Sequence, residues 1–161
     1  MEIQIIQSTD TSQDVSTETS ADAKTQYFGT ILNRFLSNIK MVHWYIRDYN
    51  KHEIFGNLYT DLSELFDSLQ EEIIGTQRAT NLDFPEFDRD STFHDEELQY
   101  YIDDKTMVDK YFVLYNNLID ILLSNEFTTY TEQTRSGILN IRDEIVSRLN
   151  KTNYLINLTN I

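Results

Sequence analysis

The chain of 161 residues contains no cysteine, one proline and only four glycines. Without cysteine it has no disulfide, no thiolate metal site and no cysteine nucleophile, and the simplest expectation is a reducing, cytoplasmic location. The scarcity of Gly and Pro argues against a sandwich or barrel, because the many turns of those folds use both residues. No apolar run approaches the length of a membrane span, so we expect no membrane partner.

Positive charge is also scarce, with 13 Lys and Arg residues against 27 Asp and Glu residues and a net charge of −14. Most of the excess negative charge lies in two segments. Residues 1–24 contain five acids and one Lys, and residues 83–104 contain nine acids and one Arg. Such a surface repels phosphate groups and offers no basic stripe to bind them. We therefore expect no nucleic acid partner.

The chain divides into a tail and one domain. Residues 1–23 are rich in Ser, Thr, Gln and acids, which predicts a flexible acidic tail, although docking of the first six residues on a neighbouring subunit is an alternative. In the domain, residues 24–158, apolar residues recur at spacings of three and four, the pattern of amphipathic helices. We expect helices over about 24–46, over 52 to either Gly75 or near Arg78, over 106–125 and over 130–158.

A long acidic connection, with a short helix expected around His94–Tyr101, separates the second and third predicted helices. The first connection, in contrast, is short. Four helices joined in this way have the connectivity of ferritin-like proteins. The expected fold is therefore an all-α, ferritin-like four-helix bundle with one long acidic connection.

Four residues in the first two predicted helices are candidate metal ligands. His43 ends the first helix and His52 begins the second, so a tight hairpin brings the two imidazoles close together. Asp67 and Glu71 lie one turn apart on the second helix, where both carboxylates can address one ion. A straight helix separates His52 from Asp67 by about 22 Å, so one chain cannot join the two pairs. Two chains packed antiparallel about a two-fold axis can form two shared sites.

The types of these side chains narrow the choice of metal without deciding it. Two imidazoles and two carboxylates suit Fe, Mn or Zn. A di-iron centre inside a single bundle needs two Glu-x-x-His pairs, but Lys40, Tyr49 and Ser91 stand three positions before the histidines, which excludes that kind of site. Packed histidines and a solvated acidic helix face remain the structural alternative for these residues.

The segment Met41–Gly75, MVHWYIRDYNKHEIFGNLYTDLSELFDSLQEEIIG, resembles the ferroxidase-site motif of Dps proteins, the mini-ferritins. The resemblance lies in His43-Trp44, His52 and Asp67-x-x-x-Glu71. This segment, together with ILNIRDEIVSRLNKTNYLINLT near the C-terminus, is also similar to Dps-like proteins of tailed bacteriophages. The connection between the two histidines is shorter than in the bacterial proteins and lacks their Gly-Pro turn. The acidic tail differs from the basic tail of Dps proteins that bind DNA.

The resemblance implies an iron site between subunits, with His43, His52, Asp67 and Glu71 as ligands and catalytic residues and Trp44 beside them. It implies that the protein oxidises and sequesters Fe(II) as a homo-oligomer, which is at least a two-fold dimer, with the twelve-subunit cage as the larger alternative. A viral source would place the protein in the host cytoplasm or in the virion. The alternative is a non-catalytic structural, virion or interaction protein that retains the ferritin-like bundle.

Overall fold

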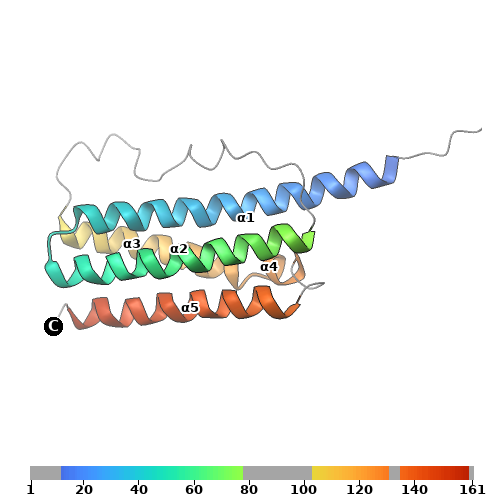
Figure 1. The fold of residues 1–161 in the computed structure, drawn as a ribbon. Coiled ribbons are helices and arrows are strands. Elements are labelled where there is room, and N and C mark those ends of the chain that lie inside the picture. The colour runs from blue at the N-terminus through green and yellow to red at the C-terminus, as the bar shows by residue number, and fades with distance from the viewer. Residues whose placement is uncertain (1–11, 78–102, 131–134, 160–161) are drawn as a thin grey trace, which may run out of the picture.

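The computed structural model describes residues 12–77, 103–130 and 135–159, and this part of the chain is almost entirely helical (Figure 1). The helices are α1 (Ser12–Tyr45), α2 (Tyr49–Gln77), α3 (Asp104–Leu122), α4 (Asn125–Tyr130) and α5 (Arg135–Leu158). No strand occurs in these three ranges. The expected all-helical class is confirmed, and the four long helices pack side by side as a bundle.

The first helix begins earlier than the apolar pattern indicated. α1 starts at Ser12, so residues 12–23, which we assigned to the tail, are helical. Apolar periodicity marks only the part of a helix that packs against a neighbour, and the first turns of α1 extend past the end of α2 (Figure 1). Residues 1–11 and the short helix expected at 94–101 lie outside the described residues.

The later helix ends also differ from the expected ones. α2 continues through Gly75, which agrees with the later of the two ends considered for it, and α5 begins at Arg135 rather than near residue 130. The short helix α4 was not expected. It begins where the Ser124 hydroxyl accepts a hydrogen bond from the backbone N–H of Phe127 (3.0 Å), and the ring of Phe127 packs edge-to-face on Phe28 of α1.

α1 and α2 form an antiparallel hairpin whose register is set at both ends. His43 stacks on His52 beside the turn, and Gln70 donates from Nε2 to the backbone oxygen of Thr25 (3.5 Å) at the other end. α3 begins at the turn end of this hairpin and packs against α1 (Figure 1). α2 and α3 therefore run in the same direction, and the connection between them joins opposite ends of the bundle.

α5 closes the bundle by packing antiparallel to both α2 and α3. The Arg148 guanidinium forms an ion pair with Asp61 of α2 (3.2 Å), and the Tyr111 hydroxyl of α3 donates to Asn153 (2.7 Å). Burial raises the pKa of Tyr111 above its ordinary value. Each long helix thus has two antiparallel neighbours, and the order of directions is up, down, down, up.

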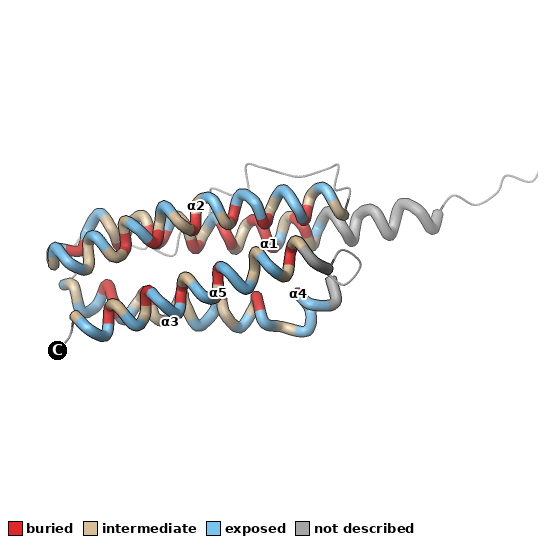
Figure 2. The backbone as a smooth tube through the Cα atoms, turned by 60° about the horizontal axis from the view of Figure 1, so that its bottom comes forward, coloured by how far each residue is buried: buried red, intermediate tan, exposed pale blue. Residues whose placement is uncertain are grey.

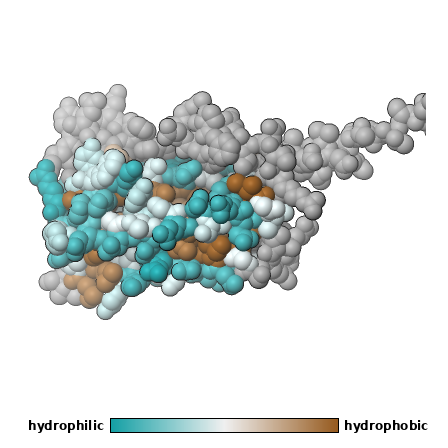
Figure 3. Space-filling model, viewed as in Figure 1, coloured by the Kyte–Doolittle hydropathy of each residue, from teal (hydrophilic) through white to brown (hydrophobic). Residues whose placement is uncertain are grey.

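The core runs along the middle of the four long helices (Figure 2). Its fully buried side chains include Ile39, Phe55, Tyr111 and Ile145, one from each long helix. Burying a side chain of this size stabilises the fold by about 1.5–3 kcal/mol. The described residues on the face seen in Figure 3 are mostly hydrophilic, with separate hydrophobic patches. Within the described ranges, no helix combines the length and apolar character needed to cross a membrane.

Candidate metal site

The turn between α1 and α2 is held by two aspartates. Asp48 precedes α2 and accepts a hydrogen bond from the backbone N–H of Lys51 (2.8 Å), as an N-cap residue does. Asp104, the first residue of α3, accepts from the backbone N–H of Arg47 (2.9 Å) with one oxygen and from that of Asp48 (2.7 Å) with the other. The three-residue turn is therefore held by Asp48, which precedes α2, and by Asp104, which begins α3.

This turn places His43 and His52 against each other. Their rings stack with centroids 4.1 Å apart and planes inclined by 28°. Nδ1 of His43 lies 3.0 Å from the backbone oxygen of His52, and Nδ1 of His52 lies 2.8 Å from the backbone oxygen of His43. The expectation that the hairpin brings the two imidazoles together is confirmed.

The two reciprocal hydrogen bonds determine which ring nitrogens can bind a metal. A carbonyl oxygen only accepts, so both Nδ1 atoms must carry their protons. In a neutral imidazole the lone pair is then on Nε2, and both Nε2 atoms are left as ligands. Metal-binding histidines commonly have this arrangement, in which the second ring nitrogen donates to a backbone carbonyl and fixes the tautomer and the ring orientation.

Gly56 provides the space for the His43 ring. It lies one turn after His52 on α2, and a Cβ atom built on it would be 2.9 Å from Cε1 and 3.1 Å from Nδ1 of His43. Real Cβ atoms do not approach ring atoms so closely. Any larger residue at position 56 must therefore displace the imidazole of His43, together with its hydrogen bond.

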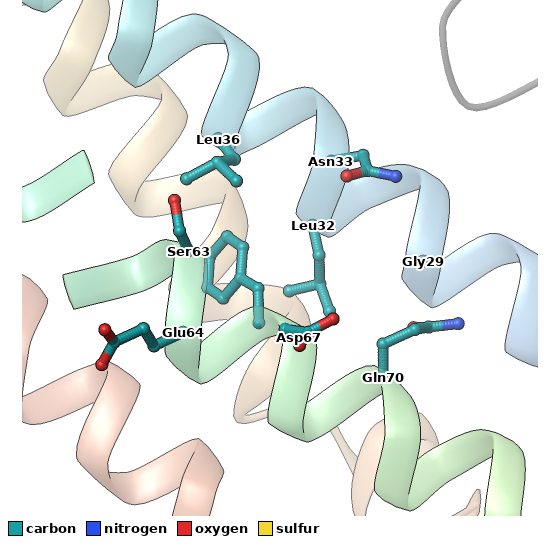
Figure 4. A pocket seen from close by; sticks show the side chains of 9 residues that line it. Gly29, Leu32, Asn33, Leu36, Ser63, Glu64, Asp67 and Gln70 are labelled. Carbon is teal, nitrogen blue, oxygen red and sulfur yellow. The ribbon is translucent and has the colours of Figure 1, made fainter. Parts of the chain in front are cut away.

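Asp67 and Glu71 lie farther along α2, and both are exposed. Asp67 borders a depression between α1 and α2, beside Ser63 and Gln70 (Figure 4). Glu71 borders a second depression, between α2 and Ile141 of α5. Within the described part of the chain, neither carboxylate accepts a hydrogen bond or forms an ion pair. Both are therefore available to an ion or to a partner.

A single chain does not bring the histidines and the carboxylates together. Among the described residues, no group of three or more His, Asp or Glu side chains is close enough to hold one metal ion. This agrees with the separation of about 22 Å that helix geometry sets between His52 and Asp67. Within one chain the two imidazoles lie against each other, whereas Asp67 and Glu71 lie farther along α2 and border different depressions.

Trp44 follows His43 in α1 and faces solvent, with 60% of its surface exposed. The ammonium of Lys40 lies 5.0 Å from the centroid of its ring and 5.6 Å from that of Tyr59 on α2. These cation–π contacts join α1 to α2 one turn away from the histidine pair. Trp44 thus lies next to the histidines along the chain and on the outer surface of the hairpin.

Two residues that shape this site were not singled out from the sequence. The sequence could have indicated Gly56, because a glycine inside a strongly periodic helix often marks a place where another group approaches the backbone closely. No sequence pattern indicated Asp104, since its contact with the turn joins residues more than fifty positions apart. Only the folded chain brings that carboxylate to the hairpin.

A comparison with models of protein families found no match for this chain, and comparisons with curated proteins and with solved structures found none either. The function is therefore inferred from the residues and from their geometry.

Proposed function

We propose that the protein is a Dps-like, iron-binding mini-ferritin that oxidises and sequesters Fe(II) at sites shared between two subunits. The direction of the four long helices supports the proposal, because a bundle with one long crossover is the ferritin-like connectivity. The resemblance of residues 41–75 to the Dps motif supports it as well. The twelve-subunit cage of Dps proteins and an origin among the phage Dps-like proteins belong to the same proposal.

The observation that carries the proposal is the state of the histidine pair. Both Nδ1 atoms face backbone oxygens at 2.8–3.0 Å, which leaves Nε2 of each histidine to bind a metal. Two imidazoles held in this way suit Fe, Mn or Zn. The exposed carboxylates of Asp67 and Glu71 supply the oxygen ligands that the same chain cannot bring to its own histidines.

In this proposal Fe(II) is the substrate. His43 and His52 of one chain bind it with Asp67 and Glu71 of the partner subunit, and Glu71 is the candidate for a carboxylate that bridges two ions. Each Fe(II) gives up one electron, and two electrons with two protons convert hydrogen peroxide into two water molecules. Dioxygen is the alternative oxidant. Fe(III) then remains with the protein.

Anaerobic Fe(II) titration, followed by peroxide with optical detection of the ferric product, tests the function. The wild type should bind Fe(II) with saturation and form ferric product. Asp67→Asn should lose most of this binding while helicity and thermal stability stay nearly unchanged, because an exposed carboxylate contributes little to folding. Asp120→Asn, which changes an exposed carboxylate of α3, is the matched control and should bind as the wild type does.

The histidine pair also favours a second candidate, a structural or interaction protein without iron chemistry. The two Nδ1 hydrogen bonds close the hairpin whether or not a metal is present. His52→Asn separates the two roles, because the asparagine amide can still donate near the position of Nδ1 but has no Nε2. A titration without saturable binding in the wild type, or wild-type affinity in His52→Asn and Asp67→Asn, would reject the ferroxidase and leave the structural protein.

A further inference from the structure

We infer that Asp104, the first residue of α3, is a positioning residue for His43 and His52. It holds the backbone N–H of Arg47 and thereby leaves the backbone oxygen of His43 to the ring of His52. The consequence for metal binding rests on the proposed function. The control of the His52 tautomer does not, because it concerns the metal-free protein.

The backbone hydrogen bonds of α1 end one step before the oxygen of His43. The last bond of the series joins the N–H of Ile46 to the oxygen of Val42 (3.0 Å). The next α-helical bond would join the N–H of Arg47 to the oxygen of His43, four residues earlier. In the structure the N–H of Arg47 donates to Oδ1 of Asp104 (2.9 Å). A carboxylate of α3 therefore takes up the donor that would continue α1.

The oxygen of His43 accepts from the ring of His52 instead. Nδ1 of His52 lies 2.8 Å from it, and this bond fixes the proton on Nδ1. If the N–H of Arg47 bound to the same oxygen, α1 would continue by one residue. The turn has only three residues, so a longer α1 must move the start of α2, where His52 lies.

The second oxygen of Asp104 holds the other side of the turn. Oδ2 accepts from the backbone N–H of Asp48 (2.7 Å), and the backbone oxygen of Asp48 accepts from the N–H of His52 (2.8 Å) in the first bond of α2. Hydrogen bonds from N–H groups to a carboxylate are stronger than those between neutral groups. One side chain of α3 thus contacts both the end of α1 and the residue that caps α2.

Loss of this carboxylate should affect the two histidines unequally. Helix geometry then offers the N–H of Arg47 the oxygen of His43, in competition with Nδ1 of His52. A His52 ring that loses its acceptor can carry the proton on either nitrogen, and its Nε2 is then a ligand in only part of the molecules. His43 should change less, because its own acceptor is the backbone oxygen of His52 within α2.

Heteronuclear NMR of the imidazole nitrogens in metal-free protein tests the positioning, at a pH above the ordinary histidine pKa of about 6.5. Both rings of the wild type should be in the Nδ1–H form. In Asp104→Ala, His52 should become a mixture of both tautomers. Arg47→Pro removes the competing donor just after the helix end, where proline is common, so the double variant should return His52 to the Nδ1–H form.

The matched control is Asp103→Ala, which removes the N-cap of α3 but no contact with the turn, and which should leave His52 in the Nδ1–H form. The same mixture in Asp103→Ala would assign the effect to α3 stability and overturn the inference. A wild-type tautomer in Asp104→Ala, or a mixture that persists in the folded double variant, would overturn it as well. If the double variant fails to fold, the two single variants decide. If Asp104→Ala fails to fold, Asp104→Asn, which keeps one acceptor atom, should show a smaller change in the same direction.

Zn²⁺, which has no redox chemistry, is the probe for the effect on metal binding. Its dissociation constant should rise at least tenfold in Asp104→Ala and stay close to the wild-type value in Asp103→Ala. Unchanged affinity in Asp104→Ala would overturn the role in metal binding. The expected tautomers in a protein that binds neither Zn²⁺ nor Fe(II) would keep the positioning and remove the ferroxidase. Saturable Fe(II) binding with wild-type tautomers in Asp104→Ala would do the reverse.

Discussion

At the scale of single residues, two glycines of α2 show how the same residue type can have opposite roles. Gly75 has open space around its Cα atom, whereas a Cβ atom on Gly56 would press against the ring of His43. A glycine inside a helix costs up to about 1 kcal/mol relative to alanine. At Gly75 no neighbouring group needs the space that the missing Cβ leaves. At Gly56 that space is occupied by the imidazole of His43.

The pair provides a matched experiment on the candidate site. Gly75→Ala should raise the free energy of unfolding by up to about 1 kcal/mol and leave Fe(II) affinity unchanged. Gly56→Ala should gain less stability, because the new methyl group displaces His43, and should weaken Fe(II) binding at least tenfold. Chemical denaturation and anaerobic titration measure the two quantities. Equal Fe(II) affinity in both variants would show that the position of the His43 ring does not matter for binding.

At the scale of elements, the bundle depends on aspartates that begin helices. Asp103 is the N-cap of α3, and its carboxylate accepts a hydrogen bond from the backbone N–H of Thr106 (2.9 Å). This bond holds the pKa of Asp103 below its ordinary value. The next residue, Asp104, clamps the α1–α2 turn. The start of α3 therefore stabilises its own helix and also the hairpin that holds the histidines.

The lowered pKa of Asp103 gives the cap a definite pH dependence. The unfolded chain takes up the proton at the ordinary pKa, about 4, and the folded chain only at lower pH. The stabilisation is therefore complete above pH 4 and disappears as the pH falls through the lowered pKa. Asp103→Ala should lower the melting temperature at pH 7, and this difference should shrink in acid.

The control for this prediction is Asp103→Ser, which retains a capping oxygen but has no carboxylate to titrate. Its melting temperature should stay above that of Asp103→Ala by an amount that changes little between pH 7 and pH 2. Calorimetry over this range provides the comparison. A wild type that keeps its full advantage over Asp103→Ala at pH 2 would contradict the assignment of the pH dependence to the cap.

At the scale of the whole molecule, the long α2 helix decides that the proposed site needs two chains. His52 lies near its start, with His43 of α1 stacked on it, and the carboxylates of Asp67 and Glu71 lie in its second half. A helix of this length does not fold back on itself. An isologous dimer therefore has either two complete sites or none. This all-or-none property can be tested with mixed subunits.

Mixing two defective variants should recreate one site. Homodimers of His52→Asn and of Asp67→Asn should bind Fe(II) poorly, because each site lacks one ligand. After subunit exchange, each heterodimer should contain one complete site and one site that lacks both ligands. With random exchange, about a quarter of the wild-type sites should reappear in the titration. Verified heterodimers that bind no more Fe(II) than the parents would reject the shared site.

Much of the architecture could be predicted from the sequence, because long helices carry their own periodic signal. The stripes from Phe28 to Ile46 and from Phe55 to Ile73 are buried in the structure as expected, except that Ile31 and Leu65 are only partly buried. Helix ends were less predictable, since the first turns of α1 extend past the end of α2 and α4 begins at a hydrogen bond to the Ser124 hydroxyl. The proximity of His43 and His52 could be predicted, because a short turn joins the helices that carry them.

What the sequence by itself determined is therefore local: the helices, their apolar faces, the short hairpin and the two pairs of candidate ligands. Only the tertiary structure decided the tautomers of the two histidines, because the acceptors of their Nδ1 protons are backbone oxygens on the opposite helix. It also decided the clamp of Asp104 on the turn. Contacts of this kind depend on the relative positions of packed helices to within about an ångström, and no periodic pattern along one helix contains that distance.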